Sequence, residues 1–328
     1  MDNTNIQSTS AASKVMKQKD IKQVTKKQLI LKIVSLILVY TFLVAVAVTV
    51  LFPFYFMLIS SVKSPEEFKV IKPALLPWQF NNGDNWAKQI EWENYKEVFT
   101  KDNLQLGRLM LNTVFVGVVS TVLSIVITVL SAFAFARLEF KGKNALFAFL
   151  LATMMIPGEL FTITNYGTVA AFGSEDFMNG MLSWMGKDTY GVLIVPFLVS
   201  VFYIYLLKQN FQQVPNELYL AAKVDGTTDM KFLIKVVLPI CKPTVITVII
   251  LKVIECWNSY VWPRLVTDDP EYFLVSNGIQ AIRESGFGRQ NIPGMMAAVV
   301  VVSVPLILLF VIFRNKIMAG VSRGGLKG

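Results

Sequence analysis

This sequence of 328 residues contains few side chains that are suited to catalysis. Histidine is absent, which excludes histidine general bases, Ser-His-Asp and Cys-His nucleophile arrangements and most zinc sites. Cys241 and Cys256 lie in or beside apolar segments without C-x-x-C spacing, so we interpret them as buried small residues. The phosphate-binding pattern G-x-x-x-x-G-K is also absent. We therefore expect no catalytic residue, no metal site and no directly bound nucleotide or other cofactor.

Residues 208–243 form a polar segment between two apolar stretches, and its first half predicts a short helix. Asn216 follows Pro215 and is a good N-cap, while Glu217 places a carboxylate in the first turn, where the helix dipole favours it. One face of this helix is apolar and rich in small residues: Leu218, Ala221, Ala222 and Val224. Because exposed apolar surfaces usually mark binding sites for partners, we expect this face to bind another protein.

The second half of the segment predicts a sharp turn and another helix. Asp225 and Gly226 end the first helix, because glycine readily adopts the backbone angles of a reversal. Thr227 or Thr228 can cap a second helix over residues 229–237. The residues that follow, at the start of the next apolar stretch, are Leu238, Pro239 and Pro243. The segment is therefore predicted to be a helix, a glycine turn and a second helix.

Lys252 and Glu255 are charged residues inside the apolar stretch that follows this segment. Charged side chains are expensive inside a membrane, so their presence indicates a specific role. They are three residues apart and are therefore neighbours on one helical face. Two interpretations are open: the pair neutralises itself against a partner protein, or it lines a polar pathway.

The elements that must position these residues are membrane-spanning helices. Hydrophobic residues make up 54% of the chain and charged residues 16%. A spanning helix needs about 20 apolar residues. Six stretches qualify: Ile30 to Val62, Leu109 to Ala136, Ala145 to Ile163, Tyr190 to Leu207, Thr244 to Trp262 and Met295 to Phe313. The first is too long for a signal peptide, and Pro53 predicts a kink or an exit from the bilayer. The sequence therefore predicts an all-α polytopic membrane protein with six transmembrane helices.

Lysine and arginine residues predict the orientation of these helices. The stretches on one side hold 19 of them and those on the other side hold 11, and the richer side is the cytoplasmic one. Both termini are then cytoplasmic. The net charge of +9 reflects the excess of basic residues in the cytoplasmic stretches. The segments outside the bilayer are a basic disordered arm over 1–28, an extracellular loop over 63–108, the cytoplasmic loop 208–243 and a cytoplasmic tail over 314–328. The arm is expected to contact anionic lipid rather than nucleic acid.

Residues 212–239 resemble the EAA loop in the permease subunits of bacterial ATP-binding-cassette importers, especially the carbohydrate, maltose-type branch. The chain keeps Pro215, Glu217, Leu218, Ala221, Ala222, Asp225, Gly226, Leu238 and Pro239 of this pattern. It departs from it at Leu220, which replaces the glutamate of E-A-A. Further similarities are Pro53–Lys63, Glu93-Asn94-Tyr95, Met154–Pro157, Trp257-Asn258 and the glycine-rich ending 320–328. The resemblance covers roughly residues 30–328.

This resemblance implies a type I importer permease over residues 29–328, located in the bacterial cytoplasmic membrane. It implies an ATP-driven, binding-protein-dependent sugar importer in which this chain forms half of the translocation pathway. The 215–239 loop, Arg323 and Lys327 would contact a separate ATPase, which binds the ATP and Mg²⁺. The implied partners are a second, homologous permease subunit, two ATP-binding subunits, an extracellular or periplasmic sugar-binding protein, the sugar and membrane lipid.

Polar and aromatic residues near the spans are candidates for the pathway, because sugars need groups that match their hydroxyls and often an aromatic platform. These candidates are Glu159, Asn165, Tyr166, Lys252, Glu255, Trp257 and Asn258. For each of them, helix capping or subunit packing is the alternative role. Two alternative functions are open as well: an ion-coupled secondary transporter and a membrane scaffold without transport activity.

Overall fold

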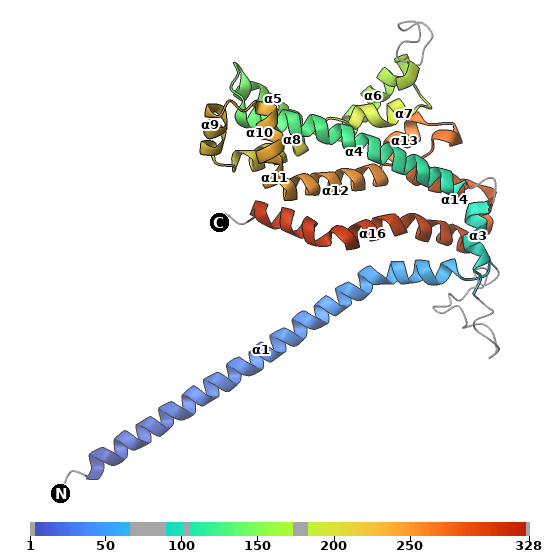
Figure 1. Ribbon diagram of the computed structural model, residues 1–328. Coiled ribbons are helices and arrows are strands. Elements are labelled where there is room, and N and C mark those ends of the chain that lie inside the picture. The colour runs from blue at the N-terminus through green and yellow to red at the C-terminus, as the bar shows by residue number, and fades with distance from the viewer. Residues whose placement is uncertain (1–3, 66–89, 101–104, 173–182, 326–328) are drawn as a thin grey trace. The chain divides into compact units, whose positions relative to one another are not determined.

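The computed structural model describes residues 4–65, 90–100, 105–172 and 183–325 of the chain (Figure 1). This described part is mostly helical and contains no strand, in agreement with the predicted all-α class. The chain divides into two compact units, Met1–Ile59 and Ser60–Gly328. Most of the predicted loop 63–108, namely residues 66–89 and 101–104, lies outside the described residues, as does Lys327.

The first unit consists of helix α1 (Thr4–Ser61), whose last two residues belong to the second unit. Its portion Gln28–Ser61 is long and apolar enough to cross a membrane, in agreement with the first predicted span. Residues 4–28 are helical, whereas a disordered arm was expected over 1–28. They contain neither proline nor glycine and continue a helix that the apolar portion nucleates. The helix also continues through Pro53.

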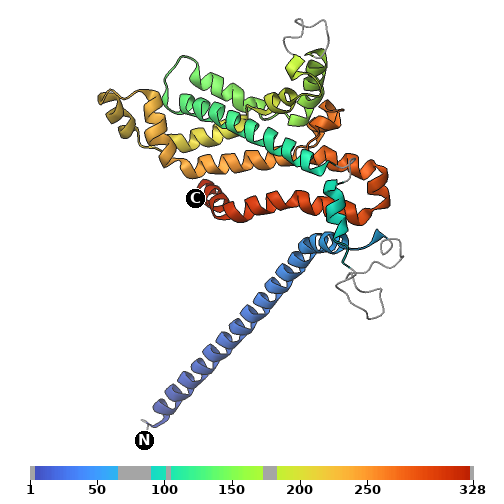
Figure 2. The same ribbon diagram turned by 45° about the vertical axis from the view of Figure 1, so that its right-hand side comes forward.

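The second unit is built around three helices, α4 (Leu106–Arg137), α12 (Lys242–Asn258) and α16 (Ile292–Gly325). Helix α12 packs against both α4 and α16 and lies between them (Figures 1 and 2). Small residues allow α4 to approach its neighbours closely: a Cβ atom added to Gly117 would lie 3.9 Å from the Cβ of Cys256 on α12. Helix α4 and Ile292–Arg314 match the second and sixth predicted spans.

The third predicted span, Ala145 to Ile163, is not one helix. Helix α5 (Lys143–Thr153) ends before Pro157, and α6 (Gly158–Phe172) begins after it. Proline donates no backbone hydrogen bond and disfavours helical angles in the residue before it, so the apolar run breaks at this point. Neither helix is long enough to be counted as a span by itself.

The fourth and fifth predicted spans are also interrupted. Helix α7 (Tyr190–Ile194), the 3₁₀ turn η4 (Val195–Phe197) and α8 (Val201–Gln212) form a pair of segments bent by 45°. Helix α12 stops at Asn258, and the short α13 (Val261–Val266) follows it. Within the described residues, three helices are long and apolar enough to cross a membrane. The number rises to as many as five if two bent pairs each count as one span, namely α7 to α8 and Asp229–Ile240 with α12.

The second unit also contains several short helices. They are α3 (Glu93–Thr100), η3 (Ser183–Met185), η6 (Pro270–Tyr272), α14 (Val275–Glu284) and α15 (Gly286–Gln290). The buried Asn94 on α3 holds the chain that leaves α1, because its Nδ2 donates to the backbone oxygens of Ser61 (3.0 Å) and Lys63 (2.8 Å). This contact explains the asparagine of the Glu93-Asn94-Tyr95 sequence.

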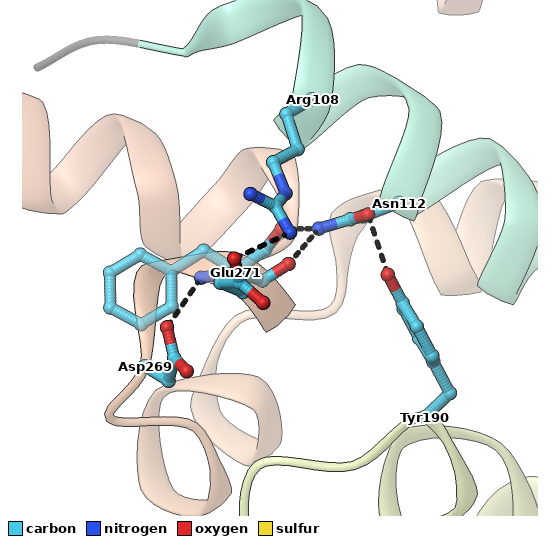
Figure 3. Close-up of polar contacts among 6 residues, drawn as sticks. Arg108, Asn112, Tyr190, Asp269 and Glu271 are labelled. Atoms are coloured by element: carbon cyan, nitrogen blue, oxygen red, sulfur yellow. Dashed lines mark hydrogen bonds and ion pairs between the residues drawn. The ribbon is translucent and has the colours of Figure 1, made fainter. Parts of the chain in front are cut away.

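A polar cluster near the start of α4 fixes the loop between α13 and α14 (Figure 3). Asn112 is buried, and its Nδ2 donates to the backbone oxygens of Glu271 (2.7 Å) and Phe273 (3.0 Å). Its Oδ1 accepts a hydrogen bond from the Tyr190 hydroxyl at 2.9 Å. Arg108, one turn earlier on α4, pairs with the Glu271 carboxylate at 3.1 Å. One asparagine therefore ties α4 to two segments that are distant in sequence.

Candidate functional site

The segment 208–243 folds into the predicted helix, glycine turn and helix. Helix α9 (Asn216–Val224) is followed by α10 (Asp229–Phe232), a π-helical turn η5 (Leu233–Val237) and α11 (Leu238–Ile240). The stretch Asp229–Ile240 meets α12 at 84°. We call residues 215–240 the hairpin. Pro215 rather than Asn216 occupies the N-cap position of α9, and Thr228 caps α10 by accepting from the backbone N–H of Lys231.

Gly226 makes the turn of the hairpin possible. Its φ of +68° lies in the left-handed region, which is costly for residues with a Cβ atom. Its N–H donates to the oxygen of Lys223 (3.0 Å), and the N–H of Thr227 donates to that of Ala222 (2.8 Å). This pair of bonds is the Schellman motif, which satisfies the last carbonyls of a helix. A Cβ atom at position 226 would meet nothing within 4 Å, so only the backbone conformation requires glycine here.

Three side chains lock the two helices of the hairpin together. Asp229 on α10 accepts a hydrogen bond from the Tyr219 hydroxyl (2.8 Å) and pairs with Lys223 Nζ (2.7 Å). These contacts, first with Lys223 and then with Tyr219, hold the pKa of Asp229 below its ordinary value. The contact with Asp229 raises the pKa of Lys223. The Tyr219 ring also meets the buried Phe232 edge-on at 5.2 Å. The hairpin is therefore held by side chains as well as by its turn.

Arg137, the last residue of α4, fastens the hairpin to the helices. Its Nη2 donates to the backbone oxygens of Phe211 (2.7 Å) and Val214, at and just beyond the end of α8. Its Nη1 donates to the side-chain oxygen of Asn216 at 3.4 Å. A guanidinium can satisfy several such carbonyls at once because its donors form a rigid fork. In the sequence, Arg137 contributes only one basic charge to the predicted topology, and sequence spacing gives no signal that it pairs with residues more than 70 positions later.

The apolar surface of the hairpin differs in part from the predicted face. Leu218, Ala221 and Val224 are exposed, Val224 at 88%, whereas Ala222 packs toward the cluster that contains Phe232. Leu220 is also exposed, at 57%. A groove of about 300 Å³ runs between α9 and the second helix, and Lys231 and Lys235 are among its lining residues. The hairpin therefore presents apolar side chains with lysines beside them.

The remaining residues predicted to bind a partner fall into three groups. Pro215, Glu217, Asp225, Gly226 and Pro239 are exposed on the hairpin. Leu238 is half-buried and packs against the same cluster as Ala222. Arg323 lies in α16, but its side chain, like all of Lys327, is outside the described part of the chain.

Lys252 and Glu255 form a small network inside the second unit. The Lys252 side chain is only 2% exposed, and its Nζ contacts Glu255 Oε1 at 3.3 Å and donates to the oxygen of Phe197 at 2.9 Å. Phe197 ends η4, where carbonyl groups lack partners within the helix. The Tyr203 hydroxyl donates to Glu255 Oε2 at 3.0 Å. Lys252 is thus paired within this chain, and together Lys252 and Glu255 link the two sides of the interruption in the fourth predicted span.

The same pair lines a cavity of about 340 Å³ between α4, α12 and the segment around η4. Asn258 also lines it, whereas Trp257 is buried in a different apolar cluster with Val275 and Met295. Tyr166 on α6 packs against a third cluster, and neither it nor Asn165 lines the cavity. Glu159 lies in the first turn of α6, and its side chain is outside the described residues. The structure therefore brings three of the seven pathway candidates together.

The family model, the relatives and the solved structure to which this chain is similar all describe components of transport systems. The family model described as "binding-protein-dependent transport system inner membrane component" matches residues 124–323. The chain is 28% identical to the diacetylchitobiose uptake system permease protein NgcG of Streptomyces coelicolor, with 87% of each chain covered. It is 32% identical to the sulfoquinovosyl glycerol transport system permease protein SmoH of Agrobacterium fabrum, covering 85% of this chain and 89% of the relative. A crystal structure of a bacterial ABC transporter involved in the import of the acidic polysaccharide alginate contains a chain of similar fold. That chain has a TM-score of 0.70 and 20% identity, with 85% of this chain and 95% of that chain covered.

Proposed function

Because the chain belongs to the family of binding-protein-dependent transport system inner membrane components, we propose that it is one permease subunit of an ATP-driven sugar importer. Members of this family are transport subunits rather than enzymes. The two relatives that name diacetylchitobiose and sulfoquinovosyl glycerol support a sugar as the cargo. The importer would contain a second, homologous permease subunit, two ATP-binding subunits that hold ATP and Mg²⁺, and an extracellular or periplasmic binding protein.

The observation that carries this proposal is the hairpin, which combines an exposed apolar surface with firm attachment to the helices. Leu218, Leu220 and Val224 are available to a partner. Behind them, Tyr219 and Ala222 pack against the cluster formed by α4, α8 and α12. We propose that an ATPase subunit binds the exposed side and that its ATP-driven closure moves these helices. This is a population shift between two arrangements, driven by contacts that differ between them.

The departure at Leu220 defines the character of this contact. An exposed leucine cannot make the polar contacts of a glutamate, but it can bury apolar area against a partner. The ATPase surface that faces Leu220 is therefore proposed to be apolar. Arg323 and Lys327 near the C-terminus are proposed as additional contacts with the ATPase.

The proposed topology has six crossings in the bacterial cytoplasmic membrane, with both termini in the cytoplasm. It requires α5 and α6 together to form the third crossing, because neither is long enough alone. The bent pair α7 to α8 would form the fourth crossing and α12 the fifth. Lys252, Glu255 and Asn258 would then lie on the part of the translocation pathway that this subunit contributes.

The proposal is tested by affinity purification of the tagged chain from its native membrane, followed by uptake measurements in vesicles. We expect an ATPase and a second permease to co-purify, and uptake to depend on ATP and to stop with vanadate. A protonophore should leave uptake unchanged at constant ATP. Uptake that stops with the protonophore but not with vanadate would instead show an ion-coupled carrier. Neither partner and no uptake would indicate a scaffold.

A further inference from the structure

We propose that the Lys252–Glu255 cavity binds one uncharged sugar ring at a time and makes this subunit selective for neutral over anionic sugars. This inference rests on the proposed function and adds a substrate class to it. Family membership leaves this class open, because the relatives' names include both diacetylchitobiose and a sulfo-substituted sugar. The charge balance of the cavity decides between the two classes.

The lining of the cavity is largely apolar and includes a few polar groups. Val116, Leu193, Phe197, Pro263 and Leu274 supply apolar surface. The polar lining residues are Ser120, Lys252, Glu255, Asn258 and Ser259, with Cys256 between them. Small-molecule sites combine these features, with a predominantly apolar lining and a few polar groups that fix orientation. The volume of about 340 Å³ lies near the lower limit of about 300 Å³ for such sites, so a single small ligand fits.

The hydrogen-bonding groups in the cavity suit hydroxyl groups. The Lys252 ammonium has three N–H donors, and two of them are used by Phe197 and Glu255. The Glu255 carboxylate accepts from Lys252 and Tyr203 and has further lone pairs. Its side chain is 49% exposed, so these lone pairs can be reached. A sugar hydroxyl can therefore donate to Glu255, while the buried Lys252 ammonium holds that carboxylate in place.

Charged ligands are disfavoured in the cavity beside Lys252 and Glu255. Glu255 lies 3.3 Å from Lys252 and balances its charge. An anion that approaches Lys252 would be repelled by Glu255 and would have to replace the carboxylate as partner. A buried charge that loses its partner is strongly destabilising. A cation would meet the corresponding repulsion from Lys252. A neutral hydroxyl ligand leaves the ion pair intact, so it is the class that the cavity admits.

The chain carries its own reporter for this site, because Cys256 lines the cavity. The other cysteine, Cys241, is buried in the cluster beside the hairpin, and a Cys241→Ala variant leaves Cys256 as the single thiol. We would measure the rate at which a small methanethiosulfonate reagent modifies Cys256 in the assembled importer. The probes are glucose and galactose and, as charged counterparts of the same size, glucuronate and galacturonate. A bound neutral sugar should slow labelling about threefold at about twice its Kd, by simple occupancy, while the uronates should not slow it.

A Glu255→Gln variant tests the cause of the selectivity. It leaves Lys252 without its counter-charge but keeps an acceptor for Tyr203, so uronates should now protect Cys256 better than the neutral sugars do. Glu139→Gln is the control, because the Glu139 side chain is 89% exposed and does not line the cavity. If the importer hydrolyses ATP and transports sugar while no neutral probe protects Cys256, or if Glu255→Gln does not shift protection toward uronates, this inference is overturned and the proposed function stands. Failure to assemble with an ATPase would overturn the proposed function itself.

Discussion

At the scale of single residues, two glycines of the described chain have a positive φ, and they allow a matched experiment. Gly226 (φ +68°) lies in the hairpin and Gly142 (φ +81°) lies before α5, and a Cβ atom at either position would have open space. Valine at position 226 forces a β-branched residue into the left-handed region, which costs about 1–2 kcal/mol. We expect Gly226→Val to distort the turn and to lower the sugar imported per ATP hydrolysed by about 5- to 30-fold, while the protein still inserts.

Gly142→Val is the control for backbone strain alone. It should lower thermal stability by a similar amount and leave the ratio of transport to hydrolysis unchanged. Equal loss of this ratio in both variants would show that general strain, rather than the hairpin, limits coupling. Normal coupling in Gly226→Val would remove the hairpin from the mechanism.

Arg137 supports a second prediction at the same scale. Its guanidinium satisfies the backbone oxygen of Phe211 in the last turn of α8 and that of Val214 just before the hairpin, and each hydrogen bond to a charged group contributes about 1.5–3 kcal/mol. Arg137→Ala should therefore loosen the start of the hairpin, seen as faster hydrogen exchange over residues 215–224 and weaker retention of the ATPase. Arg108→Ala is the control for this variant. It removes an ion pair with Glu271 at the other end of α4, and ion pairs between exposed side chains contribute little to stability. Unchanged exchange at 215–224 in Arg137→Ala would contradict the role given to this residue.

At the scale of the element, the hairpin lock has a defined dependence on pH. The pKa of Asp229 is lowered in the folded hairpin, so its contribution to stability is present above the unfolded value of about 3.9 and is lost as pH falls through the lower folded value. The pKa of Lys223 is raised, so its contribution is present below about 10.4 and is lost as pH rises through the higher folded value. The local stability of the hairpin should therefore be flat between about pH 5 and 9.

Hydrogen exchange over residues 216–232, corrected for the intrinsic effect of pH, measures this stability. Asp229→Asn should lower it at neutral pH and remove its decline in acid. Asp225→Asn, at the exposed turn, should keep the wild-type profile. A wild-type profile in Asp229→Asn would show that the contacts of Asp229 with Lys223 and Tyr219 do not stabilise the hairpin.

The hairpin and the long helices differ in how well the sequence predicts them. The bounds of α9 and the start of α10 follow from local signals, namely Pro215, Gly226 and Thr228, which act within a few residues. The apolar pattern does not predict the interruptions at Pro157 and after Phe197, because a continuous apolar run shows that a segment avoids water but not that it is one helix. The contacts of Arg137 and Asn112 join residues more than 70 positions apart, and no spacing rule reaches that far.

At the scale of the whole molecule, the exposed apolar surface of the second unit calls for lipid or another subunit. Leu111, Val118 and Val122 on α4 are exposed, and so are Leu308 and Ile312 on α16. Exposed apolar surface of this extent is unfavourable in water. Lipid and a second permease subunit would cover these residues, in keeping with the proposed assembly. The number of crossings then decides which surfaces face the cytoplasm.

The number of crossings depends on whether α5 and α6 together form one crossing. Two substituted cysteines, one on each side of this segment, test this. In a Cys241→Ala, Cys256→Ser background, Gly142→Cys lies before α5 and Lys187→Cys lies after α6. If α5 and α6 form one crossing, a membrane-impermeant thiol reagent added to intact cells should label position 187 only, and both positions after permeabilisation. Six crossings then place both termini in the cytoplasm, where charge counting puts them. If α5 and α6 instead form a re-entrant loop, both positions would react from the same side, the crossings would number five, and the two termini would lie on opposite sides of the membrane.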